Sequence, residues 1–222
     1  MSRFLSKASE SLLPYTPGEQ PQGRKFIKLN TNECPYPPSP KVAEAILAGY
    51  EEIAAGCGTA GAADMAEQAE KAARVMPPEL ANLRLYSDPE ERVLIEAIAD
   101  HYGVGTNQVI AGNGSDEILG FAFRAFCDQN APLQFADLTY GFYPALCGLY
   151  GIPFKAVPLE EDFTLNIEPY KNCGNNVIIA NPNAPTGMSL PLSAIEEVAA
   201  SNPDRVVMVD EAYVDFGGES CV

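Results

Sequence analysis

Three short segments of the sequence combine residue types that could bind a charged, planar ligand. They are residues 111–117 (AGNGSDE), residues 181–187 (NPNAPTG) and residues 210–213 (DEAY). Each follows a stretch that is predicted to be a strand, and the chain alternates such strands with helical segments. In open α/β sheets, ligands lie beyond the carboxyl ends of the strands. We therefore expect the three segments to surround one site.

The first segment has the features of an anion-binding helix start. Gly112 and Gly114 allow a tight turn, and a helix is predicted from Ser115 to Cys127. The backbone N–H groups of Ser115 and Asp116 then lie in the first helical turn, where the helix dipole favours a phosphate. Taken alone, the segment also fits an ordinary turn in which Ser115 or Asp116 caps the backbone.

The other two segments add a polar loop and an acid. Two prolines and a glycine fix residues 181–187, and their Asn side chains project over a strand end; a rigid turn is the alternative reading. Asp210 follows the apolar run 206–209, where a carboxylate costs desolvation energy unless it has a partner; an N-cap is its alternative role. Together the segments predict a phosphorylated heteroaromatic cofactor whose protonated ring nitrogen meets Asp210.

The elements that must position these segments alternate along the chain. Strands are predicted over residues 108–111, 133–136, 154–157, 176–180 and 205–209. Helices are predicted to begin at Ser39–Pro40, at Asp88–Pro89, at Ser115, at Thr139 and at Ser193, the last with Glu196 in a capping box. Apolar strands that alternate with helices predict an α/β fold, a three-layer sandwich with a mostly parallel central sheet.

Three parts of the chain are expected to differ in organisation. Residues 1–38 are rich in proline and are expected to form an irregular N-terminal arm. Residues 39–86 are expected to form a helical segment with an inserted Ala/Gly-rich excursion at about 55–81. Residues 87–222 are expected to form the α/β part that carries the site.

The composition argues against several classes of protein. Lys and Arg number 14 against 30 for Asp and Glu, and the net charge of −16 disfavours binding to nucleic acid or anionic membranes. The six cysteines form no CxxC pair, and the single histidine, His101, has no partner for a metal site; we expect His101 to pack or to carry a last-turn helix charge. No secretory signal or membrane-spanning run is recognised, so a reducing cytoplasm is expected.

Six motifs occur in an informative order and spacing: residues 29–33 (LNTNE), 85–86 (LY), 114–117 (GSDE), 139–143 (TYGFY), 181–187 and 210–213. They resemble the fold-type I pyridoxal-phosphate aminotransferases, and more closely the histidinol-phosphate aminotransferases. The resemblance covers nearly the whole chain except about 50–81. It implies the large domain of that fold and pyridoxal 5'-phosphate as the cofactor.

The resemblance also implies roles for the matching residues. Gly114, Ser115 and Asp116 would hold the cofactor phosphate, Tyr140 would stack on the ring, and Asp210 would pair with the ring nitrogen.

Further positions would complete the site from elsewhere in the chain. Tyr86 would reach the phosphate of the partner subunit, which implies a homodimer, and Tyr15 and Asn32 would line the substrate site.

The ring hydroxyl of the cofactor is where the sequence departs from the family pattern. Tyr213 would bind this hydroxyl, but the family usually has Asn where this chain has Ala184. Asn183 is the candidate substitute, with Asn181 placed behind it.

The resemblance implies the exchange of an amino group: L-histidinol phosphate and 2-oxoglutarate give imidazole-acetol phosphate and glutamate. None of the seven lysines has the sequence context of the family's Schiff-base lysine, which is expected beyond Val222. No catalytic residue is therefore assigned, and the 222-residue chain is expected to be inactive alone. The alternatives are a related enzyme, such as a threonine-phosphate decarboxylase or an aromatic aminotransferase, and a non-catalytic fragment or binding module.

Overall fold

The structure, a computed structural model, describes residues 2–10, 12–13, 32–56, 80 and 82–222. The chain divides into two compact units, one of residues 1–14 with 93–222 and one of residues 15–92. Tyr15 and most of the Ala/Gly-rich excursion lie outside the described residues. The three-part organisation expected from the sequence remains a prediction.

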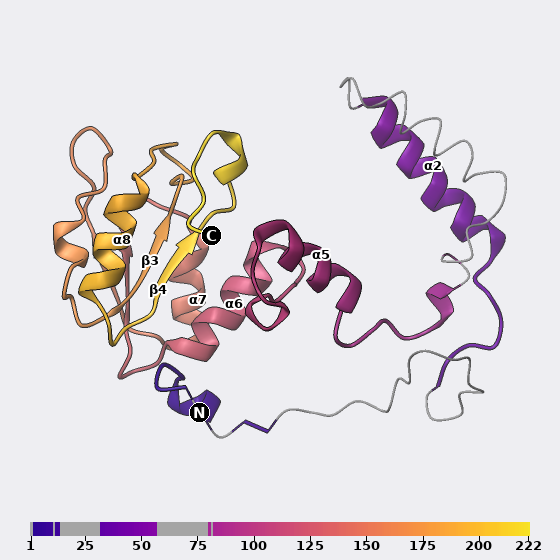
Figure 1. Cartoon of the computed structure of the whole chain (residues 1–222), viewed down its shortest axis with the longest axis horizontal. Coiled ribbons are helices and arrows are strands. Elements are labelled where there is room, and N and C mark those ends of the chain that lie inside the picture. The colour runs from indigo at the N-terminus through magenta and orange to yellow at the C-terminus, as the bar shows by residue number, and fades with distance from the viewer. Residues whose placement is uncertain (1, 11, 14–31, 57–79, 81) are drawn as a thin grey trace. The chain divides into compact units, whose positions relative to one another are not determined.

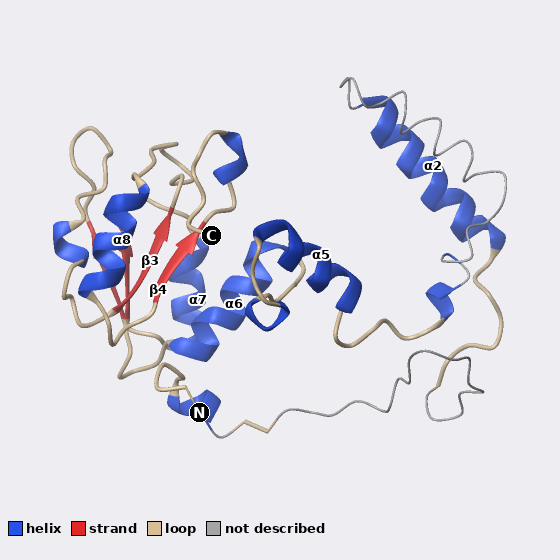
Figure 2. Cartoon of the chain, viewed as in Figure 1, coloured by secondary structure: helices blue, strands red, loops and turns tan. Residues whose placement is uncertain are grey.

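Strands and helices alternate through the larger unit (Figures 1 and 2). Its elements are α1 (Lys7–Glu10), α5 (Arg92–Tyr102), η2 (Thr106–Gln108), α6 (Gly114–Phe126), β1 (Leu133–Ala136), α7 (Phe142–Tyr150), β2 (Phe154–Val157), η3 (Glu168–Tyr170), β3 (Asn176–Ala180), α8 (Leu192–Ser201), β4 (Val207–Asp210) and η4 (Val214–Phe216). The first residue of α5, Arg92, falls in the smaller unit.

The four strands form one parallel sheet in the order β2-β1-β3-β4. Ala180, the last residue of β3, lies opposite Asp210, the last residue of β4. Because all pairings are parallel, the segments that follow these strands emerge at one edge of the sheet. The predicted α/β fold with a parallel central sheet is confirmed.

Helices cover both faces of the sheet, and β3 shows why its sequence is apolar throughout. Ile178 belongs to a core with Phe123 of α6 and Tyr143 of α7. Ile179 belongs to a second core with Val198 of α8. Successive side chains of a strand point to opposite faces, so a strand covered on both sides alternates between two cores and stays apolar at every position.

The strand predicted at residues 108–111 is absent. Thr106–Gln108 form a 3-10 turn, and Val109 has extended dihedral angles but pairs with none of the four strands described. An apolar alternating pattern records only local preference, whereas a strand also needs a neighbour that supplies the ladder of hydrogen bonds.

Three predicted helix starts are also wrong in detail. The helix expected at Asp88 begins at Arg92, because Asp88 closes a turn by accepting from the backbone N–H of Glu90 (3.1 Å) and of Arg92 (3.3 Å), while Glu91 takes a positive φ of 48°. Helix α8 begins at Leu192 with Pro191 as its cap residue and with no side-chain cap bond, so the Ser193 capping box does not form. The start of α7 is Phe142, three residues after the predicted Thr139.

The first residues of the chain pack on α6 within the larger unit. The backbone N–H of Ser6 donates to the carbonyl of Ala125 (2.7 Å), and its hydroxyl donates to the carbonyl of Arg124 (2.9 Å). The N–H of Lys7 donates to the carboxylate of Asp128 (3.0 Å), and this bond is the main cause that lowers the pKa of Asp128. Ser6, directly before α1, thus satisfies carbonyls at the end of α6, which a helix leaves without partners.

The smaller unit contains α2 (Pro40–Gly56) and η1 (Asn82–Arg84). The start of α2 at Pro40 confirms the predicted Ser39–Pro40 signal. The Arg84 guanidinium donates to the carbonyl of Cys34 (2.9 Å), which joins two stretches distant in sequence. Among the residues described in either unit, no helix is both long enough and apolar enough to cross a bilayer.

Candidate cofactor-binding site

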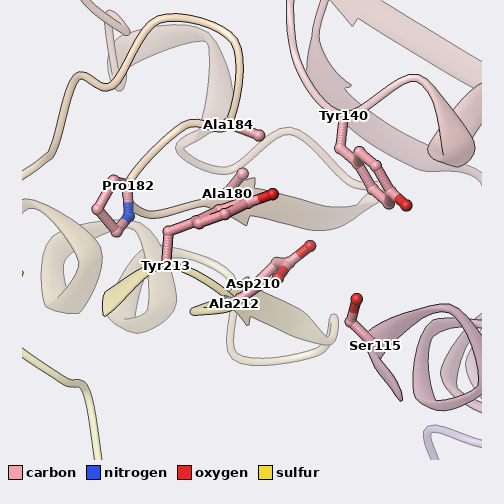
Figure 3. A pocket seen from close by; sticks show the side chains of 8 residues that line it. All are labelled: Ser115, Tyr140, Ala180, Pro182, Ala184, Asp210, Ala212 and Tyr213. Carbon is pink, nitrogen blue, oxygen red and sulfur yellow. Dashed lines mark hydrogen bonds between the residues drawn. The ribbon is translucent and has the colours of Figure 1, made fainter. Parts of the chain in front are cut away.

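One pocket at the carboxyl edge of the sheet is lined by residues from all three segments predicted to meet (Figure 3). It encloses about 350 Å³, including its open mouth. Its lining residues are Ser115, Tyr140, Ala180, Pro182, Ala184, Asp210, Ala212 and Tyr213. Ser115 and Asp210 therefore lie on the same side of the sheet and border one space, as the sequence-based hypothesis required.

At the start of α6, no side-chain cap bond occupies the amides of Ser115 and Asp116, while the N–H of Gly114 donates to the carbonyl of Gly112 (3.1 Å). Gly114 has a φ of +80°, a conformation that favours glycine, and Asn113 is the cap residue but makes no side-chain cap bond. The carboxylate of Glu117 accepts from the N–H of Asn113 (2.6 Å), and the carboxylate of Asp116 is bonded to Tyr140 instead of the helix backbone. The alternative of a turn capped by Asp116 is therefore not the arrangement observed.

Asp210 is held at both carboxylate oxygens. Its Oδ2 accepts from the hydroxyl of Tyr143 (2.7 Å), and its Oδ1 accepts from the backbone N–H of Ala212 (3.2 Å). The second bond resembles the capping role considered from the sequence, yet Asp210 also lines the pocket. These two hydrogen bonds offset the desolvation cost of placing a carboxylate at the end of an apolar strand.

Tyr143 has a function that the sequence analysis did not assign. Burial and the bond to Asp210 raise the pKa of this phenol well above its ordinary value, so the hydroxyl remains a hydrogen-bond donor. A signal was present: Tyr143 lies in the apolar segment that forms α7, and a buried tyrosine needs a partner for its hydroxyl. The identity of that partner, 67 positions away, could not be read from the sequence.

Two aromatic residues border the open part of the pocket. The hydroxyl of Tyr140 donates to Asp116 (2.8 Å), and this bond is the main cause that raises the pKa of Tyr140. Tyr213 follows β4 and is 51% exposed. In Figure 3 both side chains lie around the same space as Ser115 and Asp210.

The loop of residues 181–187 is braced by its own asparagines. Asn183 accepts from the hydroxyl of Thr139 (2.7 Å) and donates to the carbonyl of Leu138 (3.0 Å) and to Thr186 Oγ1 (3.0 Å). Asn181 exchanges two hydrogen bonds with the backbone of Leu190. The side-chain amides of Asn181 and Asn183 therefore already have hydrogen-bond partners, in this loop and in the loop after β1.

The neighbouring residues Asn183 and Ala184 therefore lie differently with respect to the pocket. Ala184 lines the pocket, whereas Asn183, the candidate ligand for a ring hydroxyl, is not among the lining residues. The structure places Asn183 where it joins two loops.

The described structure does not place three predicted residues relative to this pocket. Tyr15 lies outside the described residues, and Asn32 and Tyr86 belong to the smaller unit. Tyr86 is 61% exposed, and its backbone N–H donates to the carboxylate of Glu33 (3.2 Å). The roles assigned to these three residues stay predictions.

The similarity of the sequence to a known protein family agrees with this geometry. The family described as "Aminotransferase class I and II" matches residues 24–222. The chain belongs to this family. Figure 3 thus shows a pocket of a class I and II aminotransferase, at the strand ends where the fold places its ligands.

Individual relatives of this aminotransferase chain carry a narrower name. A histidinol-phosphate aminotransferase of Pseudomonas putida (strain W619) is 45% identical over 222 residues, which is 100% of this chain and 56% of the relative. Histidinol-phosphate aminotransferase 1 of Methylococcus capsulatus is 48% identical over 220 residues, which is 99% of this chain and 54% of the relative. The chain spans little more than half the length of these relatives.

A solved structure supports the same assignment of family and fold. The histidinol-phosphate aminotransferase of Sinorhizobium meliloti, solved in complex with pyridoxal-5'-phosphate, superposes with a TM-score of 0.55 at 26% identity. The match covers 59% of this chain and 37% of that one.

Proposed function

We propose that this chain forms the cofactor-binding face of a pyridoxal-phosphate-dependent aminotransferase that acts on histidinol phosphate. The observation that carries the proposal is the single pocket bordered by Ser115, at the start of α6, and by Asp210, at the end of β4. The family membership and the names of the relatives from P. putida and M. capsulatus support it.

The donor set fits pyridoxal phosphate, which has an anionic phosphate at one end and a basic ring nitrogen at another. The first turn of α6 offers the backbone N–H groups of Ser115 and Asp116, a local device for an anion in a chain of net charge −16, whereas the N–H of Gly114 donates to the carbonyl of Gly112 (3.1 Å). Asp210 offers a carboxylate that is already held in place. Tyr140 and Tyr213 offer aromatic surface and hydroxyl groups beside the same space.

Bound pyridoxal phosphate would supply a ring that withdraws electrons from the reacting carbon of the substrate. Asp210 would hold a proton on the ring nitrogen, because a carboxylate stabilises the adjacent positive charge. Tyr140 would cover one face of the ring and exclude water there, and the hydroxyl of Tyr213 would donate to the ring hydroxyl. These residues bind and orient; none of them is proposed to move the substrate proton.

The proposed reaction transfers the amino group of L-histidinol phosphate to 2-oxoglutarate, giving imidazole-acetol phosphate and glutamate. The proposal includes a homodimer in which Tyr86 reaches the site of the partner subunit, and a substrate site lined by Tyr15 and Asn32. A cytoplasmic location is part of the same proposal.

Cofactor binding tests the pocket directly. In the protein at its full natural length, Asp210→Asn is expected to weaken pyridoxal phosphate binding by about 10-fold or more, since it removes the charge that faces the ring nitrogen. Asp215→Asn is the matched control, because Asp215 is an exposed acid in η4, outside the residues that line the pocket. Equal affinities for all three proteins would contradict the site.

A substrate panel tests the reaction. The full-length protein is expected to transfer the amino group of histidinol phosphate to 2-oxoglutarate faster than that of an aromatic amino acid. Release of carbon dioxide from threonine phosphate, without amino transfer from histidinol phosphate, would instead establish the decarboxylase alternative.

A further inference from the structure

We propose that Tyr143 is a positioning residue that holds the Asp210 carboxylate in the orientation needed by a protonated ring nitrogen. The proposal rests on the proposed function, because it concerns how the chain's own residues prepare the carboxylate for pyridoxal phosphate. Its starting observation is the 2.7 Å hydrogen bond from the Tyr143 hydroxyl to Asp210 Oδ2, which joins α7 to the end of β4.

The Tyr143 ring is fixed by its surroundings. Its side chain is fully buried (0% exposed), with the rings of Phe135 and Tyr140 each 5.7 Å away between centroids and the ring of Phe123 at 6.1 Å. A side chain packed on several sides keeps one rotamer, so the hydroxyl is held where it stands. The donor that reaches Asp210 is therefore part of the hydrophobic core.

The backbone of Asp210 is fixed as well. Asp210 pairs in register with Ala180 in the parallel sheet, and its carbonyl accepts from the N–H of Asn181 (2.9 Å). The Ala212 N–H occupies Oδ1, and Tyr143 occupies Oδ2. Because each carboxylate oxygen can accept more than one hydrogen bond, both anchors leave acceptor capacity for a ligand in the pocket that Asp210 lines.

The chemistry of the pair also suits a cationic ligand. Burial and the Asp210 bond favour the protonated phenol of Tyr143, which therefore donates its hydrogen bond without giving up the proton. A hydrogen bond donated to a carboxylate stabilises the negative charge of that carboxylate. Tyr143 thus acts as a donor to Asp210 and leaves the carboxylate as the acceptor for a protonated ring nitrogen.

Tyr170 provides a matched control within the same chain. It is equally buried (0% exposed) but belongs to the core on the other face of the sheet. Its hydroxyl has no hydrogen-bond partner within the described part of the chain. Tyr170→Phe therefore removes the same atom as Tyr143→Phe without touching Asp210.

The experiment compares two ligands on the protein at its full natural length. One is pyridoxal phosphate, and the other is deazapyridoxal phosphate, in which a C–H group replaces the ring nitrogen. Dissociation constants are measured by equilibrium dialysis for the unmodified protein, Tyr143→Phe, Asp210→Asn, the double variant and Tyr170→Phe. Thermal unfolding of each variant checks that it is folded.

Tyr143→Phe is expected to weaken pyridoxal phosphate binding about 10-fold and to change the affinity for the deaza ligand less than about 2-fold. In the Asp210→Asn background, the same change is expected to have no further effect on pyridoxal phosphate binding. Tyr170→Phe is expected to leave both affinities unchanged.

Two results would overturn the positioning role while leaving the proposed function intact. One is an equal loss for both ligands, which would mean that Tyr143 only supports the fold of the pocket. The other is an unchanged affinity of Tyr143→Phe in a protein that still prefers pyridoxal phosphate to the deaza ligand. If the unmodified protein shows no such preference, the proposed pairing of Asp210 with the ring nitrogen fails, and this inference fails with it.

Discussion

Replacing Asn183 with alanine tests what holds together the two loops that carry Tyr140 and Ala184. Asn183 is 8% exposed, and its side chain makes hydrogen bonds to Leu138, Thr139 and Thr186. The first two of these residues follow β1 and the third belongs to the loop after β3. Asn183 therefore bridges the ends of two neighbouring strands.

The magnitude follows from these three bonds. A hydrogen bond contributes about 0.5–1.5 kcal/mol net, and a buried group left without a partner costs about 1–3 kcal/mol. Because the site lies at the edge of the sheet, water can replace part of what is lost, and we expect Asn183→Ala to lower the free energy of unfolding by about 2 kcal/mol. With a slope of about 2 kcal/mol per M, the urea midpoint would fall by about 1 M.

The assay is urea unfolding followed by circular dichroism, together with pyridoxal phosphate binding. Asn166→Ala is the control, because Asn166 is exposed and both of its side-chain hydrogen bonds, to the Glu160 carboxylate and from the N–H of Glu168, lie on the surface. We expect the control to lie within about 0.5 kcal/mol of the unmodified protein.

The result also decides between two roles for Asn183. If Asn183→Ala unfolds at the same urea concentration as the unmodified protein but binds pyridoxal phosphate more weakly, the bracing role is refuted. Asn183 would then act as the ligand of the ring hydroxyl that the sequence suggested.

Three further outcomes are expected. Phe123→Ala, at a fully buried core position, should lower the free energy of unfolding by about 3–5 kcal/mol; an unchanged melting temperature would contradict the assigned core. Burial raises the pKa of Cys127 to about 11 and of Cys147 to about 12, from an ordinary value of 9.0. The unfolded thiols therefore ionise first, and the urea midpoint should fall as the pH rises from about 9 through 11–12; a midpoint that holds steady over this range would refute that burial. Asp116→Asn should lower the pKa of Tyr140 towards its ordinary value. A spectrophotometric titration of the tyrosines would detect this change, with Tyr140→Phe identifying the contribution of Tyr140. Identical titration curves for the unmodified protein and Asp116→Asn would show that the Asp116 bond is not the cause.

The elements with strong local patterns were predicted correctly. Residues 133–136, 154–157 and 176–180 are strands with the predicted bounds, and α6 begins one residue from its predicted start. In these segments the apolar period, the turn residues and the burial seen in the structure agree, so local preference and tertiary packing favour the same conformation.

The predictions that were wrong depended on distant residues. Residues 108–111 had a strand-like pattern but no neighbouring strand in the described sheet. Within α6, Phe123 is the most buried residue (0% exposed). The deeper packing of Phe123 follows from Tyr143 of α7, a neighbour that helical periodicity cannot supply.

The sequence by itself determined the alternation of strands and helices, and therefore that residues 111–117, 181–187 and 210–213 would meet at one edge of a parallel sheet. It also determined the chemistry of the pocket, because a glycine-rich helix start and an acid at a strand end are local features. Only the tertiary structure decided which side chains hold that pocket in place. The bonds from Tyr143 to Asp210 and from Asn183 to Leu138 span 67 and 45 positions, and such contacts exist only after the sheet has brought the segments together.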